Sequence, residues 1–259
     1  MPDSPHKAVV QESFTRQASA YAVTPTVADP SRIARLVEAV DPTPQSRVLE
    51  VACGPGFLAL AFAQRCREAV GLDLTDAPLA IAEKSRQERG LDNVRFQRGD
   101  ADRLPFAEGE FDVVVCRFAF HHFEEPGRVL LEMARVCRPQ GRVAVEDLVS
   151  SEHRARGDYQ NRFERLRDSS HTRALAPSEL LGLFNAAGLE LERLYSGELV
   201  QNLERWLANS QTPPDRAAEV RAMIERDARE DLSGTCPYFE DGQWFFRQPT
   251  LAVVARRLT

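Results

Sequence analysis

The stretch Val48–Gly56, which reads VLEVACGPG, decides the fold that this sequence specifies. Its first half is a short run of β-branched and aliphatic residues, which favours a buried strand. The Cys-Gly-Pro-Gly that follows cannot continue a strand, and the next segment, FLALAFAQRC, has helical spacing of its apolar residues. The stretch therefore predicts a strand, a tight glycine turn and a helix.

The glycine turn can hold a ligand close to its backbone. Gly54 and Gly56 lack a Cβ atom, so the chain can adopt positive φ angles and lie against a bound molecule. The N–H groups that open the helix at Phe57 have no partner within the helix and can face the ligand. Asp73 ends the next apolar run, where a carboxylate can accept both hydroxyl groups of a ribose. We therefore expect a nucleoside at this turn.

Two classes of cofactor fit this turn. The pattern Gly54-x-Gly56-x-x-Ala59 formally satisfies the dinucleotide-binding fingerprint, which is a weak signal when it stands alone. Glu50, inside the first strand, would repel a pyrophosphate but attract the ammonium group of an amino-acid tail. Asp100 follows a third apolar run and can accept a hydrogen bond from an adenine amino group. These carboxylates favour a sulfonium nucleoside with an amino-acid tail over a dinucleotide.

The sequence resembles the class I S-adenosylmethionine-dependent methyltransferases, in particular the small-molecule branch that includes the quinone-biosynthesis C-methyltransferases. The resemblance covers roughly residues 14–149 and rests on VLEVACGPG, GLDLT, GDADRLPF, FDVVVCRFAFHHF and EMARVCRPQGRVAVED. One departure is Pro55 between the two glycines, which removes an N–H donor and stiffens the turn. The resemblance implies S-adenosylmethionine as the cofactor and S-adenosylhomocysteine as its product.

The resemblance also implies which residues contact the cofactor. It assigns the first turn to Ala52, Gly54 and Gly56, the ribose to Asp73 and Leu74, the adenine to Asp100 and Ala101, and a further contact to Cys116, Arg117 and Phe118. It further suggests that the N-terminal segment folds over the cofactor. We add Glu50 for the ammonium group, Cys53 at the end of the first strand, and Tyr21 on an apolar helical edge of that segment.

Composition sets broad limits on the function. A chain of 259 residues with 43% hydrophobic content can form one domain with a small cap. The net charge of −6 argues against a nucleic-acid substrate, because phosphate binding calls for a basic face. The five cysteines show no zinc-ligand spacing, so we expect reduced thiols and no metal site. Since no apolar run suits a signal peptide or a membrane span, we expect a cytoplasmic monomer or homodimer that does not use the membrane.

Strands and helices alternate in the order that gives a Rossmann-like, doubly wound α/β sheet. We expect seven strands, mostly parallel with an antiparallel last strand. The strands are predicted at 47–52, 68–73, 94–97, 111–116, 141–146, 190–195 and 250–257, and the helices at 30–40, 57–65, 76–88, 127–136 and 177–187.

The chain also divides into a core and segments that we expect to cover it. The predicted division is an N-terminal cap at 1–30, a cofactor-binding core at 31–150, a lid insertion at 151–176, a core helix and strand at 177–199, a second lid insertion at 200–248 and a last core strand at 249–259. Both insertions follow strands that end at the carboxyl edge of the sheet, where ligands bind in such folds. Within the cap, residues 1 to about 10 are expected to form a mobile tail.

Histidines near the same edge are candidates for catalysis. Methyl transfer from a sulfonium mainly requires positioning, and a base is needed only where the acceptor must lose a proton. His121, after the fourth strand, and His171, in the segment RDSSHTRAL, are the candidate catalytic residues, with His121 preferred. We interpret His122 as a structural residue at the start of the next helix. An arginine of RDSSHTRAL could hold a carboxylate or carbonyl group of the acceptor.

The expected function is transfer of a methyl group to O or C of a small aromatic, quinone-like or polyketide-like acceptor. Two alternatives stay open. The protein could bind S-adenosylmethionine and use it for a rearrangement, a decarboxylation or no chemistry, since fold does not settle function. It could also be a nicotinamide-dependent oxidoreductase on the same kind of sheet, although Glu50 and Asp100 count against that interpretation.

Overall fold

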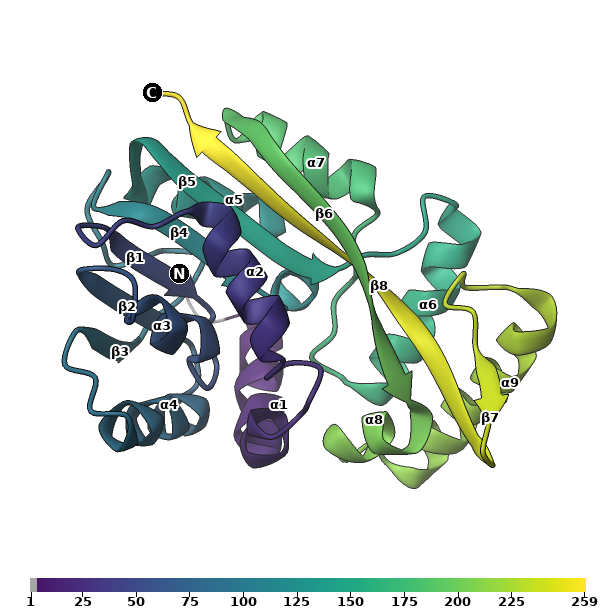
Figure 1. Cartoon of the computed structure of the whole chain (residues 1–259). Coiled ribbons are helices and arrows are strands. Elements are labelled where there is room, and N and C mark those ends of the chain that lie inside the picture. Colours follow the sequence, from purple (N-terminus) through teal and green to yellow (C-terminus); the bar gives the residue numbers. More distant parts are fainter. Residues whose placement is uncertain (1–3) are drawn as a thin grey trace.

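The computed structural model describes residues 4–259, and these form an eight-stranded sheet flanked by helices (Figure 1). The strands are β1 (Arg47–Val51), β2 (Glu68–Asp73), β3 (Val94–Arg98), β4 (Phe111–Arg117), β5 (Cys137–Leu148), β6 (Leu189–Asn202), β7 (Tyr238–Glu240) and β8 (Gln243–Arg257). The helices are α1 (Pro5–Ala22), α2 (Pro30–Val40), α3 (Phe57–Phe62), α4 (Asp76–Glu88), α5 (Pro126–Val136), α6 (Arg154–Arg167), α7 (Pro177–Ala186), α8 (Leu203–Asn209) and α9 (Pro214–Glu230), with a 3-10 turn η1 (Phe120–His122).

The strand order β3-β2-β1-β4-β5-β8-β6 confirms the doubly wound α/β fold. Strands β1 to β5 pair in parallel, whereas β8 runs antiparallel to both β5 and β6. The chain leaves β1 toward β2 on one side and returns to β4 on the other, so the order reverses between β1 and β4. Ligands of such sheets bind at the carboxyl ends of the strands beside this reversal.

The core consists of two apolar layers, one on each face of the sheet. Leu49 and Val51 of β1 point to the face covered by α5 and α7, whereas Val48 points to the face covered by α2 and α3. Because successive side chains of a strand alternate between faces, an apolar run such as VLEV supplies both layers. Glu50 is the one polar residue of this run, and it is buried on the α3 side.

The glycine turn between β1 and α3 has the predicted shape. Gly56 has a φ angle of 75°, and a Cβ atom placed there would lie 2.5 Å from a ring carbon of Phe96. Only glycine satisfies both the positive φ angle and this close approach. Ala52, at the end of β1, also adopts a positive φ of 54°, which is a strained conformation for a residue with a side chain.

The last two strands are longer than predicted. β6 continues to Asn202 and β8 begins at Gln243, because the two pair with each other beyond the edge of the parallel sheet, up to Asn202 opposite Phe245. A short hairpin with β7 adds the eighth strand, where seven were expected. The paired extension carries α6, α8 and α9 at one end of the molecule (Figure 1). We call these three helices the helical layer.

Aromatic side chains hold the helical layer on this extension. Phe163 of α6, Trp206 of α8 and Phe246 of β8 are buried and pack edge to face, with ring centroids 4.8 to 6.1 Å apart. Such geometry is favourable for aromatic rings beyond their burial of apolar area. The layer therefore has its own small core, separate from the two cores of the sheet.

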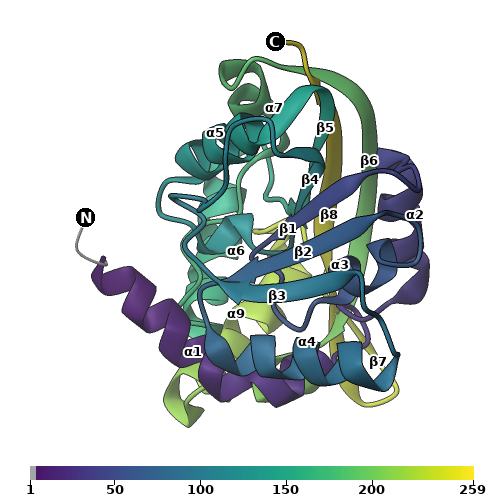
Figure 2. The ribbon, with the colours of Figure 1, turned by 90° about the vertical axis from the view of Figure 1, so that its left-hand side faces the viewer.

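The expectation of a mobile tail is wrong for residues 5–10, which form the first turns of α1. Ser4 caps this helix by accepting a hydrogen bond from the Lys7 N–H. α1 lies beside α4 and crosses the carboxyl edge of the sheet (Figure 2). Its contacts there are tertiary, with partners far along the chain, which is why a local pattern does not reveal them. The remainder of that prediction, residues 1–3, lies outside the described residues.

Candidate active site

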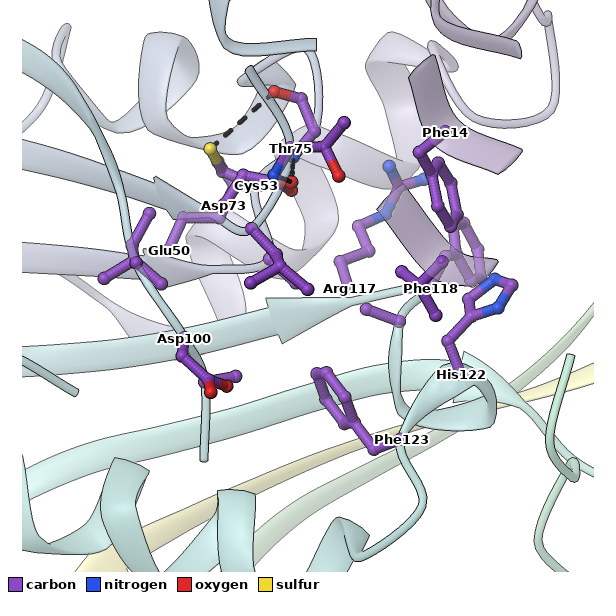
Figure 3. A pocket seen from close by; sticks show the side chains of 18 of the residues that line it. Phe14, Glu50, Cys53, Asp73, Thr75, Asp100, Arg117, Phe118, His122 and Phe123 are labelled. Atoms are coloured by element: carbon purple, nitrogen blue, oxygen red, sulfur yellow. Dashed lines mark hydrogen bonds between the residues drawn. The ribbon is translucent and has the colours of Figure 1, made fainter. Parts of the chain in front are cut away.

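A cavity opens at the carboxyl ends of β1, β2 and β4, beneath α1 (Figure 3). We call it the first cavity. Eleven of the thirteen residues predicted to contact a cofactor line it: Tyr21, Glu50, Ala52, Cys53, Gly54, Asp73, Leu74, Asp100, Ala101, Arg117 and Phe118. The strand ends predicted from separate stretches of sequence therefore meet in one place.

The other two predicted contacts, Gly56 and Cys116, do not line the first cavity. The Gly56 N–H donates to the Cys53 carbonyl oxygen at 2.9 Å, and its backbone packs against Phe96. Cys116 is fully buried within β4, one residue before the cavity wall. Gly56 therefore shapes the turn and does not face the cavity. Cys116 belongs to the core, because a strand residue adjacent to a ligand-facing residue points to the opposite side.

The side chain of Asp73 is held by backbone N–H groups of the two loops that follow β1 and β2. Its two carboxylate oxygens accept hydrogen bonds from the N–H groups of Gly54 and Thr75, at 2.8 and 2.9 Å. Burial raises the pKa of Asp73, although the N–H donors from the backbone oppose the rise. Each carboxylate oxygen retains a lone pair, so Asp73 can still accept two hydroxyl groups from a ligand.

Glu50 lies deeper in the first cavity. It accepts a hydrogen bond from the Ala59 N–H at 2.7 Å, which anchors the start of α3 to β1. Burial raises the pKa of Glu50 to about 8, against the opposing effect of the Ala59 N–H and the Arg117 guanidinium. A cationic group placed beside Glu50 would favour its charged form and be held by it.

Arg117 presents a positive charge to the same cavity. Its Nε donates to Glu146 at 2.9 Å and its Nη1 donates to the Val27 carbonyl oxygen at 2.8 Å. Its Nη2 is buried and, within residues 4–259, hydrogen bonds to nothing. A buried donor without a partner is costly, so this nitrogen marks a place where a ligand oxygen would be stabilised. Phe118, whose ring lies 4.4 Å from the guanidinium carbon, keeps the side chain in position.

Lys7 of α1 is a cavity residue that the sequence reasoning missed. Its Nζ lies 2.5 Å from Asp100 and 2.6 Å from Asp102. The residue stands in the segment that was expected to be mobile, and no local pattern links it to the strand ends. The carboxylate of Asp100 is therefore ion-paired with Lys7 of α1, and a ligand amino group at this end of the cavity would contact the same carboxylate.

A second cavity adjoins the first, between α1, the end of β4 and the helical layer. Both cavities share one wall, formed by Phe14, Tyr21, Val27, Phe118 and His122. Three of these residues, Phe14, Phe118 and His122, gather at one side of the view in Figure 3. The second cavity also contains His121, Arg167 and Trp206. The two cavities therefore adjoin each other at these five residues.

His121 and Asp147 form a hydrogen-bonded pair at the edge of the second cavity. His121 Nδ1 lies 2.5 Å from an oxygen of Asp147, and the His121 N–H donates to the other oxygen at 3.1 Å. Burial by itself lowers the pKa of His121, but the Asp147 carboxylate outweighs this and leaves it above 6.5. With Nδ1 held by Asp147, Nε2 is the nitrogen that can take a proton, and no described residue hydrogen bonds to it.

His171, the other predicted catalytic residue, lies behind His121 and lines neither cavity. Its Nε2 is hydrogen-bonded to Asn161 at 2.8 Å, and burial holds its pKa well below 6.5. The structure does not bring it to a ligand. We therefore retain His121 and interpret His171 as packing against it, with ring centroids 5.4 Å apart.

His122 has a different environment from its neighbour. Its Nδ1 is hydrogen-bonded to the Ser170 carbonyl oxygen at 2.9 Å, and the ring of Phe14 packs against it edge to face. Burial, together with the charge of His121, lowers the pKa of His122 to about 4. A neutral ring in the wall between the two cavities therefore adds no positive charge there at neutral pH.

The described part of the chain contains no grouping of three or more His, Cys, Asp or Glu residues suited to a metal ion. Among the helices between residues 4 and 259, none has both the length and the apolar character needed to cross a bilayer. The fold and the first cavity together define a doubly wound α/β protein with a ligand-sized cavity at the carboxyl edge of its sheet.

Comparison with known proteins identifies the family within this class. The family model described as a methyltransferase domain matches residues 49–145. The uncharacterized methyltransferase YcgJ of Bacillus subtilis is 32% identical over 223 residues, which cover 86% of this chain and 88% of that protein. The crystal structure of YcgJ superposes with a TM-score of 0.84 at 28% identity, covering 88% of this chain and 99% of that one.

A quinone-modifying relative matches a shorter region. Demethylmenaquinone methyltransferase of Thermus thermophilus is 43% identical over 101 residues, which cover 38% of this chain and 46% of that protein. Since YcgJ is similar over most of both chains, the present chain belongs to the class I S-adenosylmethionine-dependent methyltransferases.

Proposed function

We propose that this enzyme transfers a methyl group from S-adenosylmethionine in the first cavity to an oxygen or carbon atom of a small acceptor in the second. The observation that carries this proposal is the common wall of the two cavities. One side of the wall offers carboxylates and a guanidinium suited to a zwitterionic nucleoside, and the other offers the free Nε2 of His121.

The first cavity fits S-adenosylmethionine group by group. Asp73 would accept the ribose hydroxyls and Asp100 the adenine amino group. Glu50 would hold the ammonium of the methionine tail, and the Nη2 of Arg117 its carboxylate. The tail is a zwitterion, so a buried carboxylate and a buried guanidinium side by side complement its two charges.

The residues around the wall have separate tasks in the reaction. When bound, S-adenosylmethionine would supply an electrophilic methyl group with its sulfur as the leaving atom, and the acceptor would supply the electron pair of the new bond. His121 takes the acceptor proton on Nε2, and Asp147 stabilises the resulting imidazolium. Phe14, Tyr21 and Phe118 exclude water from the point of transfer.

Calorimetric titration tests the cofactor assignment. The wild-type protein should bind S-adenosylhomocysteine and should not bind NADH. Arg117→Met should weaken S-adenosylhomocysteine by about 1 to 3 kcal/mol, the value of a lost charge-assisted hydrogen bond. The same variant should bind 5′-methylthioadenosine, which lacks the amino-acid tail, as tightly as the wild type does. Preferential binding of NADH, or equal losses for both nucleosides, would contradict the assignment.

A small-molecule acceptor is supported by the second cavity and by the net charge of −6. Turnover is tested by the appearance of S-adenosylhomocysteine only when an acceptor is added. A protein that binds S-adenosylmethionine tightly yet forms no S-adenosylhomocysteine with any acceptor would instead favour the non-methylating alternative.

A further inference from the structure

We infer that the acceptor is a planar hydroxy acid, with its carboxylate held by Arg167 and its ionising hydroxyl group, or the carbon conjugated to it, facing His121. This inference rests on the proposed function, because it describes the occupant of the second cavity. It is carried by three features of that cavity: a guanidinium with free donors, aromatic walls and the imidazole of His121, whose Nε2 makes no hydrogen bond to the described residues.

Arg167 ends α6 and lines the second cavity. Its Nε donates to the Trp206 carbonyl oxygen at 3.3 Å, and its guanidinium carbon lies 4.8 Å from the centre of the Trp206 ring. These contacts fix the plane of the guanidinium group. Its two terminal nitrogens donate to no atom of the described residues, which leaves the fork geometry that recognises a carboxylate with two parallel hydrogen bonds.

The neighbouring carboxylate of Asp168 does not hydrogen bond to the terminal nitrogens of Arg167. Asp168 lies 3.9 Å from Arg167 Nη1, beyond hydrogen-bond distance. Its oxygens already accept from Gln17 at 3.2 Å and from the N–H and hydroxyl of Ser170 at 2.9 and 2.6 Å. These donors stabilise the charge of Asp168 together with the positive charge of Arg167, which lies close to the carboxylate but does not hydrogen bond to it. The arginine can therefore turn its donors to a ligand, and no other arginine or lysine of residues 4–259 lines this cavity.

Two glutamines, Gln201 and Gln248, add polar but uncharged groups to the lining of the second cavity. Gln201 donates to the side-chain oxygen of Gln248 at 2.8 Å, and Gln248 donates to Glu164, which lies outside the cavity lining. This chain orients both amides and leaves the oxygen of Gln201 without a hydrogen bond from the described residues. It can accept a hydroxyl or amino hydrogen but cannot neutralise an anion. An acidic group of the acceptor is therefore directed to Arg167.

The remaining walls favour a flat molecule whose acidity matches His121. Phe14, Phe118 and Trp206 present aromatic rings to the cavity, against which a planar conjugated acceptor can stack. A hydroxyl group conjugated to such a ring or to a carbonyl is acidic enough for an imidazole to remove its proton near neutral pH. The reaction then methylates the oxygen itself or the carbon that shares its negative charge.

Binding of matched acids and esters tests this inference. The protein is saturated with S-adenosylhomocysteine and titrated in a calorimeter with 2-, 3- and 4-hydroxybenzoate and with the methyl ester of each. At least one acid should bind roughly tenfold more tightly than its ester, since a charge-assisted pair of hydrogen bonds is lost in the ester. In Arg167→Gln, that acid and its ester should bind equally.

A matched control lies on the same helix. Arg162 is ion-paired with Glu219 at 2.6 Å on the surface and lines neither cavity, so Arg162→Gln should keep the preference for the acid. The inference is overturned if no acid is preferred by the wild type, or if the preference survives in Arg167→Gln. Binding of S-adenosylhomocysteine distinguishes failure of the proposed function from failure of this inference. If the wild type does not bind S-adenosylhomocysteine, the proposed function fails. If it binds S-adenosylhomocysteine but shows no preference for acids, only this inference fails.

Discussion

At the scale of the residue, His121 and Asp147 divide one task between them. The carboxylate fixes the ring through Nδ1 and raises the pKa of His121, which leaves Nε2 for the role of base in the proposed reaction. The imidazole works as a base only when it is neutral. Turnover should therefore rise with pH through the pKa of His121.

Replacement of His121 by Gln should lower kcat by about 10²–10⁴-fold, the usual contribution of a general base, and leave the affinity for S-adenosylhomocysteine unchanged. Asp147→Asn removes the charge that raises the pKa of His121, so the rising limb of the pH profile of kcat should move to lower pH. His153→Gln, at an exposed position, serves as the control. An unaltered kcat in His121→Gln would reduce that residue to packing.

Glu50 is buried in a place that destabilises its charged form, which is the form that the proposed contact with an ammonium group requires. Its pKa is about 8 in the folded protein and 4.5 in its ordinary state, so the folded form binds an extra proton between these values. The contribution of Glu50 to stability is therefore fully present below pH 4.5 and is lost as the pH rises to about 8.

Glu50→Gln should remove this loss, because the amide stays neutral and can still accept from the Ala59 N–H. We expect the variant to have a higher Tm than the wild type at pH 8 and a lower affinity for S-adenosylhomocysteine. Thermal unfolding between pH 5 and pH 9 measures the first effect, with the exposed Glu88→Gln as control. Parallel stability curves for wild type and Glu50→Gln would show that the carboxyl group is not titrating there.

At the scale of the element, α1 connects parts of the site that are far apart in sequence. Lys7 reaches Asp100 and Asp102, Gln11 donates to the Leu74 carbonyl oxygen, and Gln17 donates to Asp168. The helix thus spans from the first cavity to the second. We propose that α1 closes over the cofactor and must loosen to release it.

Lys7→Gln should weaken this closure, since the ammonium contacts two carboxylates at once. Backbone amides of α1 should exchange hydrogen faster, and S-adenosylhomocysteine should dissociate roughly two- to fivefold faster, in line with a partly exposed ion pair. Lys84→Gln, on the exposed side of α4, provides the matched control. Unchanged exchange in α1 would mean that the ion pair does not hold the helix closed.

At the scale of the whole molecule, the strand ends and α1 line the first cavity, and the helical layer completes the second. Phe246 is fully buried and touches both Phe163 and Trp206, so it links β8 to α6 and α8. The ends of β1, β2 and β4 do not depend on this cluster. The two binding functions should therefore be separable by mutation.

Phe246→Ala should cost about 3 to 5 kcal/mol of unfolding free energy, the range for truncating a buried phenylalanine. Binding of S-adenosylhomocysteine should persist, whereas binding of acceptors should be lost. Urea unfolding and calorimetry measure the two effects, and Phe239→Ala, at a position 60% exposed, should change stability by less than about 0.5 kcal/mol. Joint loss of both ligands would show that the cavities form as one unit.

Local sequence was sufficient to predict the doubly wound sheet and most of the strand-end residues of the first cavity. Glu50 lies inside β1, Asp73 ends β2 and Asp100 follows β3, and parallel strands bring their carboxyl ends to one edge. The first turn requires positive φ angles at Gly54 and Gly56, which glycine adopts most easily. Each of these signals is complete within about ten residues of chain.

The tertiary structure decided the rest. Lys7 joins the site through contacts with residues more than 90 positions away, His121 and not His171 faces a cavity, and β6 and β8 extend because they pair with each other. The physical reason is that strand ends and turns depend on the conformational preferences of the residues that form them. The closing of a site depends instead on which distant surfaces pack together, and no local pattern records that.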